Sequence, residues 1–267
     1  MKKTVACVVA LDLIFLLVIL ISGSLYGMLS DAIYFAAYLL PLIAFSWLAK
    51  GEKKISFSLR ISRTDALMCL PLIAPTIGVT IGLSALASLL LSFCGAGTTE
   101  PLTGELFELL ILHALLPAVL EEALFRYVPL TLITPHSKKS AVIISALLFA
   151  VAHCNISQMP YAFAAGVVFA VLDLAMGSLF PSLLLHLLNN VVSVFWLWDV
   201  SAPVFRLPLT ISLVTLTFIS VALVVIFRGR YTKKVTFLVD KDDKISIAPQ
   251  VFVFVTVCMA LAIGALL

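Results

Sequence analysis

Charged residues are scarce in this sequence. Only 12% of its 267 residues are Asp, Glu, Lys or Arg, and 63% are hydrophobic, whereas soluble domains have roughly 25% charged and 45–50% apolar residues. A soluble domain needs more charged side chains than this to solvate its surface, and a disordered chain is far less hydrophobic. The near balance of 17 basic and 14 acidic residues also disfavours nucleic-acid binding. The composition therefore predicts a membrane protein.

Several catalytic and metal-binding motifs are also missing. No C-x-x-C pair is present, which disfavours a disulfide scaffold and a zinc ribbon. The sequence has no G-x-S-x-G, no H-E-x-x-H and no conventional catalytic-cysteine context, so serine, zincin and cysteine mechanisms lack their signatures. The five cysteines lie in or beside apolar runs and are interpreted as small buried hydrophobic residues: Cys7, Cys69, Cys94, Cys154 and Cys258.

Apolar runs long enough to cross a bilayer occur along the whole chain. A membrane-spanning helix takes about 20 mostly apolar residues, and about nine candidate segments are found. They lie at 4–28, 32–49, 66–94, 105–134, 140–157, 159–176, 181–198, 208–227 and 249–267. The expected fold class is all-α, a polytopic membrane helix bundle of about eight to nine transmembrane helices. It divides into N-terminal helices (1–104), a central core (105–200) and C-terminal helices (201–267).

The distribution of Lys and Arg predicts the orientation, because cytoplasmic loops collect basic residues. With the N-terminus inside, the inner segments hold 15 of the 17 basic residues, Arg206 lies outside, and Arg126 lies within a membrane segment. We expect an integral protein of the plasma membrane with a cytoplasmic N-terminus. The first segment is expected to remain as a helix, because it is long and contains Asp12. Residues 229–248 are expected to form a short cytoplasmic hairpin loop.

Ionisable and amide side chains gather in the fourth to seventh segments. Such groups cost several kcal/mol inside a bilayer unless they are paired or face a wet cavity, so each is a candidate functional residue. They are Glu121, Glu122, Arg126, His153, Asp173, His186, Asn189 and Asn190.

The spacing of these residues suggests separate roles. Glu121 and Glu122 are about 100° apart on a helix and are not expected to face one point. Glu122 and Arg126 are four residues apart and can pair, which leaves Glu121 free to act. Pro117, one turn earlier, is expected to loosen the helix and admit water. A purely structural ion pair with a spare glutamate is the alternative.

The histidines extend this pattern. His186 and Asn190 are also four residues apart, so an imidazole and a carboxamide face one way as two neutral donors. They can either stabilise an oxyanion or join neighbouring helices by hydrogen bonds. His153 alone is typical of a core histidine. Together with a free carboxylate, these groups suit hydrolysis by activated water, without a covalent nucleophile.

Three motifs resemble those of a known family. The run from Glu121 to Arg126 matches E-E-x-x-x-R, Phe149 to His153 matches F-x-x-x-H, and His186 to Asn190 matches H-x-x-x-N. In this order, on successive membrane segments, they resemble the CPBP (Abi) family of intramembrane proteases, which includes type II CAAX prenyl endopeptidases. The resemblance covers roughly 105–200. Residues 1–104 and 201–267 resemble the family only in being membrane helices.

The resemblance implies an endopeptidase. Glu121 and His153 would bind and activate the attacking water, and His186 and Asn190 would stabilise the oxyanion, with Glu122 and Arg126 in support. No cofactor is required in this glutamate-type mechanism. Zinc held by Glu121, His153 and His186 is the open alternative, since these residue types are common zinc ligands.

The expected partners are the lipid bilayer and a membrane-anchored protein or peptide substrate, with no nucleic acid. Asp173, His113 and Asn155 are secondary candidates near the site, and His136 is expected to be solvated. A transporter would place similar groups in membrane helices, and a non-proteolytic scaffold or immunity protein of the same family is a further alternative. The chain lacks an inverted repeat, which disfavours the transporter, and its intact motifs argue against an inactive scaffold.

Overall fold

The structure is a computed structural model, and it describes residues 1–22, 28–93, 95, 102–198 and 202–265. Within these residues the chain forms helices and no β-strand, apart from two isolated bridges at Ser58 and Leu102. The all-α fold class is therefore confirmed.

Each of the nine expected segments is helical. In chain order the long helices are α1 (Lys2–Ser22), α2 (Met28–Leu48), α3 (Arg63–Phe93), α7 (Lys138–Ala152), α8 (Met159–Met176), α9 (Phe180–Leu197), α10 (Ala202–Ile226) and α12 (Pro249–Gly264). The remaining segment, between α3 and α7, is a series of short helical pieces: α4 (Leu106–Leu110), η1 (Ile111–Leu115), α5 (Leu116–Glu122), η2 (Ala123–Tyr127) and α6 (Val128–Ile133).

Five helices in the described residues are long and apolar enough to cross a membrane. They lie at Lys2–Ile21, Arg63–Phe93, Met159–Met176, Phe180–Leu197 and Leu207–Ile226, and two shorter apolar helices lie at Ala32–Leu48 and Pro249–Gly264. The broken segment 106–133 and α7 are not among these seven helices. Both contain polar side chains within their apolar sequence, namely Glu121, Glu122, Arg126 and Ser145. An integral membrane protein with a helical bundle follows from this architecture.

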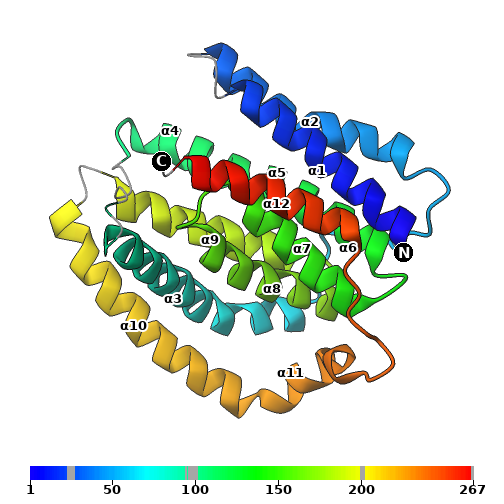
Figure 1. Ribbon diagram of the computed structural model, residues 1–267. Helices are drawn as coiled ribbons and strands as arrows, with labels where there is room; N and C mark the ends of the chain where they lie inside the picture. Colours follow the sequence, from blue (N-terminus) through cyan, green and yellow to red (C-terminus); the bar gives the residue numbers. More distant parts are fainter. Residues whose placement is uncertain (23–27, 94, 96–101, 199–201, 266–267) are drawn as a thin grey trace.

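The helices pack as a bundle around α7 and α8 (Figure 1). α8 contacts α7, α3 and α9, while α12 covers α7 and α1. The largest buried apolar cluster joins α1, α2, α6, α7 and α12. α10 packs mainly on α3 and exposes most of its apolar surface, as expected of a lipid-facing helix.

The segment 106–133 departs from α-helical geometry at two places, and each precedes a proline. The π-helix η1 ends one residue before α5, whose first turn contains Pro117, and η2 leads into α6, whose first turn contains Pro129. Proline has no backbone N–H, so the carbonyl four residues earlier loses its helical donor. Ser145 Oγ donates to the freed Phe125 carbonyl over 2.6 Å instead. The expected loosening near Pro117 is confirmed.

The loops that contain most of the basic residues gather at one end of the molecule, beside the N-terminus (Figure 1). Thr4 Oγ1 donates to Glu52 Oε2 over 2.6 Å and lies 3.1 Å from His136 Nε2. Lys234 pairs with Asp65 over 2.9 Å. The arrangement agrees with the clustering expected from the sequence.

The expected hairpin over 229–248 was wrong. Arg228–Lys234 forms helix α11 and Thr236–Val239 forms the 3-10 helix η4, with no strand in this described stretch. An isolated two-stranded hairpin is marginally stable, and this segment instead makes contacts with the bundle. Tyr231 donates to the Met68 carbonyl over 3.0 Å, and Ser246 N donates to Ser140 Oγ over 2.9 Å.

Candidate active site

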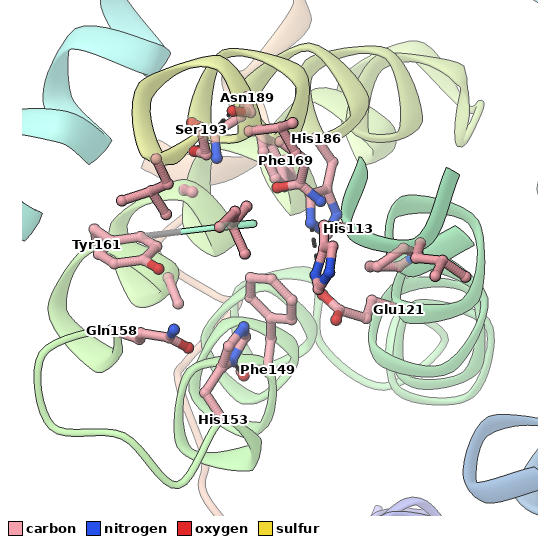
Figure 2. Close-up of a pocket in the computed structure, with 18 of the residues that line it drawn as sticks. His113, Glu121, Phe149, His153, Gln158, Tyr161, Phe169, His186, Asn189 and Ser193 are labelled. Carbon is pink, nitrogen blue, oxygen red and sulfur yellow. Dashed lines mark hydrogen bonds and ion pairs between the residues drawn. The ribbon is translucent and has the colours of Figure 1, made fainter. Parts of the chain in front are cut away.

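A cavity of about 590 Å³ lies inside the bundle, between α2, η1, α5, α7, α8 and α9. Four of the six predicted site residues line it: Glu121, His153, His186 and Asn190. Figure 2 shows Glu121 and His186 on one side of the Phe149 ring and His153 on the other. The rest of the wall is mostly apolar and aromatic, with Tyr161, Phe169 and Val194 among its residues.

Glu122 and Arg126 lie behind this wall as the predicted ion pair. Arg126 Nε is 3.7 Å from Glu122 Oε2, and both side chains are buried. The guanidinium also donates to the Phe125 carbonyl over 3.1 Å and lies 4.3 Å from the Phe149 ring centroid. These contacts support a charged side chain with no access to solvent, and the pairing expected from the i,i+4 spacing is present.

His186 lies between the two glutamates. Its Nδ1 is 2.8 Å from Glu122 Oε1, and its Nε2 is 3.5 Å from Glu121 Oε2. The two glutamates point in different directions, as the sequence indicated, yet both contact this imidazole, because it has nitrogens on two edges. The imidazole is also stacked on Phe169, with ring centroids 5.7 Å apart.

The contacts of His186 determine how it can donate. Glu122 faces the permanently charged Arg126, so it is a carboxylate, and His186 Nδ1 donates its proton to it. A neutral His186 then has a bare Nε2 and cannot serve as the neutral donor expected from the sequence. Only an imidazolium donates from both nitrogens.

His153 presents its other nitrogen to the cavity. Its Nδ1 is 2.8 Å from the Phe149 carbonyl, and a carbonyl only accepts, so Nδ1 holds a proton. The neutral ring therefore has a free acceptor at Nε2. Phe149 packs edge-on against both histidines, with centroids 5.0 Å from His153 and 5.6 Å from His186. Among the described residues, no hydrogen bond or ion pair joins His153 to Glu121.

Sequence reasoning missed two tyrosines on α2. Tyr38 donates to Glu121 Oε1 over 3.2 Å, and the Tyr34 hydroxyl lies 3.2 Å from that of Tyr38. Tyr-x-x-x-Tyr in an apolar helix was the available signal, since i and i+4 share a face. Thr80 on α3 was also missed, and its Oγ1 donates to Asn189 Oδ1 over 2.6 Å.

The secondary candidates lie in different places. His113 lines the cavity from η1. Asp173 is buried and accepts from Ser182 N over 3.1 Å in the first turn of α9, so it acts as a helix cap. Asn155 is exposed and accepts from Ser157 in a local turn, away from the cavity. His136 is exposed, although it contacts Thr4.

No group of three or more His, Cys, Asp or Glu side chains in the described residues is arranged to hold a metal ion. In the predicted zinc set, His186 directs one nitrogen to Glu122, and His153 directs one nitrogen to a backbone carbonyl.

The fold and the site define a helical membrane protein with a carboxylate–histidine cavity inside its bundle. Residues 103–192 match the family model of type II CAAX prenyl endopeptidase Rce1-like proteins, and all three motifs fall within that match. The resemblance seen in the motifs is confirmed, and the central segment has the sequence of a family of protease-type enzymes. No curated protein and no solved structure matches the chain.

Proposed function

We propose that the protein is an intramembrane endopeptidase that hydrolyses a peptide bond of a membrane-anchored protein or peptide. The observation that carries this proposal is the meeting of Glu121, His153, His186 and Asn190 at one cavity within an apolar helical bundle. These four residues, and most of the others that line the cavity, lie in the segment that matches a family of protease-type enzymes. A carboxylate with nearby hydrogen-bond donors suits the activation of water and the stabilisation of a tetrahedral oxyanion.

Each residue has a distinct role in the proposed reaction. Glu121 takes a proton from a water molecule, and His153 Nε2 accepts the second hydrogen of that water and orients it. The water oxygen attacks the substrate carbonyl carbon, and the carbonyl oxygen becomes an oxyanion. The imidazolium Nε2–H of His186 and the Asn190 amide donate to it. The C–N bond then breaks, and Glu121 returns its proton to the leaving amine.

Glu122 and Arg126 act on His186 in this mechanism. Glu122 accepts from Nδ1 over 2.8 Å, which fixes the orientation of the ring. Arg126 keeps Glu122 ionised and in place. The proposed mechanism needs no metal ion. Zinc bound at about one ion per chain would overturn this and assign the water to the metal.

The experiment compares the termini of membrane proteins, by mass spectrometry, in cells that contain equal amounts of the wild-type chain or Glu121→Gln. Loss of the carboxylate base removes a contribution of about 10²–10⁴-fold, so the new termini that form with wild type should be missing with Glu121→Gln. Glu108→Gln is the matched control, because Glu108 is an exposed glutamate of the same matched segment. Cleavage that survives in Glu121→Gln contradicts the mechanism. If none of the three strains has termini that are missing from cells without the protein, a non-catalytic scaffold is favoured.

A further inference from the structure

The hydroxyl of Tyr38 lies where it can hold the Glu121 carboxylate. Tyr38 is 3% exposed, and its hydroxyl is 3.2 Å from Glu121 Oε1. The ring is held by Phe15, at a centroid distance of 4.8 Å, and by Tyr34, at 5.4 Å. The hydroxyl position is therefore fixed by packing from α1 and α2, which lie outside the matched segment 103–192.

The direction of the hydrogen bonds follows from the acceptor. A carboxylate only accepts, so Tyr38 donates to Glu121, and its oxygen is then free to accept from Tyr34. Tyr34 also lines the cavity. Each bond in such a chain polarises the next, which strengthens the bond to Glu121.

The two carboxylate oxygens of Glu121 have different neighbours. Oε1 is held by Tyr38, while Oε2 faces His186 over 3.5 Å. A glutamate without the tyrosine could rotate about its side-chain torsions, whereas a general base must lie within a few tenths of an ångström of its productive position.

We propose that Tyr38 is a positioning residue for Glu121, with Tyr34 acting through Tyr38. The inference rests on the proposed function for its effect on turnover. Its structural alternative is that the tyrosines only pack α2 against the bundle. Tyr38→Phe separates the two, because it removes the hydroxyl and keeps the ring contacts with Phe15 and Tyr34.

The first test needs no substrate. Infrared difference spectra of the full-length protein in lipid nanodiscs, wild type against Glu121→Gln, identify the carboxyl band of Glu121. Tyr38→Phe is expected to shift that band, and Tyr34→Phe to shift it less in the same direction. Tyr231→Phe is the control, because it removes a tyrosine hydrogen bond of 3.0 Å outside the cavity. An unmoved band in Tyr38→Phe overturns the proposal.

The second test measures the rate at which Glu121-dependent termini form in cells. Loss of a hydrogen bond to a charged group is expected to slow Tyr38→Phe by about 10- to 100-fold. The double variant Tyr34→Phe/Tyr38→Phe should be no slower than Tyr38→Phe, and Tyr231→Phe should match wild type. An unchanged circular-dichroism spectrum in Tyr38→Phe shows that the helical fold is retained and that the slower rate reflects the missing hydroxyl.

The two proposals fail in different ways. Wild-type rates in Tyr38→Phe, with termini that still depend on Glu121, overturn the positioning role and leave the protease intact. An absence of Glu121-dependent termini overturns the protease. In that case only the infrared test addresses whether Tyr38 holds Glu121. The proposed effect of Tyr38 on turnover is then rejected together with the protease.

Discussion

At the scale of single residues, the buried charge of Arg126 is the feature on which we expect stability to depend most. The side chain has no exposed surface, and its nearest carboxylate, that of Glu122, is also buried. Removing one partner of a buried pair leaves an uncompensated charge and costs about 3–5 kcal/mol. Arg126→Met is therefore expected to lower Tm in detergent by roughly 6–20 °C. Thermal unfolding followed by circular dichroism measures the change.

The double variant Glu122→Gln/Arg126→Met is the internal check, because it removes both charges and should recover part of the lost stability. Arg230→Met provides a matched control, since Arg230 is exposed and also lies over an aromatic ring, that of Phe227. Its Tm should stay within about 2 °C of wild type. A double variant as unstable as the sum of its single changes would contradict the pairing.

The sequence predicted this ion pair but not the position of His186. Residues four apart on one helix are neighbours whatever surrounds them, so the contact of Glu122 and Arg126 follows from local geometry. The contacts of His186 with Glu121 and Glu122 join α9 to α5, and that of Tyr38 joins α2 to α5. Such contacts depend on how helices far apart in sequence pack together.

At the scale of elements, the close approach of α7 and α8 holds Arg126 in place. A Cβ added to Gly166 would lie 3.0 Å from Ala146 Cα, 3.1 Å from Ala146 Cβ and 3.2 Å from Arg126 Nη2. The backbone of α7 cannot yield as a flexible side chain would, so Gly166→Ala should separate the helices or displace the guanidinium. We expect a loss of about 1–3 kcal/mol, measured as a decrease in Tm.

Gly82→Ala is the control for this prediction. Gly82 is also within a helix, α3, but a Cβ there would meet no atom within 4 Å. Alanine costs less conformational entropy than glycine in a helix, so Gly82→Ala should leave Tm unchanged or raise it slightly. Equal destabilisation by both variants would show that helix packing at Gly166 is not the cause.

The sequence predicted the positions of the helices along the chain, but not how they depart from α-helical geometry. Runs of apolar residues indicated all nine helical segments, because burial in lipid requires them. The two π-helical turns before Pro117 and Pro129 were expected only as a loosening near Pro117. Their exact form depends on tertiary partners, such as the Ser145 hydroxyl that donates to the freed Phe125 carbonyl.

At the scale of the whole molecule, the loops at the two ends differ in charge. The loop between α2 and α3, which is rich in lysine, and the basic helix α11 lie at the end near the N-terminus, while the segment that leads into α4 lies at the other end (Figure 1). Basic loops stay on the cytoplasmic side during membrane insertion. Hydrogen bonds also join residues 137–140 to residues 243–246, so these two polar segments lie together.

This asymmetry predicts an orientation that labelling can test. In a chain whose five native cysteines are replaced, Lys241→Cys at the basic end and Thr103→Cys at the other end are both exposed. A membrane-impermeant maleimide added to intact cells should label Thr103→Cys, whereas Lys241→Cys should react only after permeabilisation, because basic loops are expected on the cytoplasmic side. Labelling of both positions after permeabilisation confirms that each is reachable. Labelling of Lys241→Cys but not Thr103→Cys in intact cells would contradict the prediction. It would place the basic loops outside the cell and Thr103 on the cytoplasmic side.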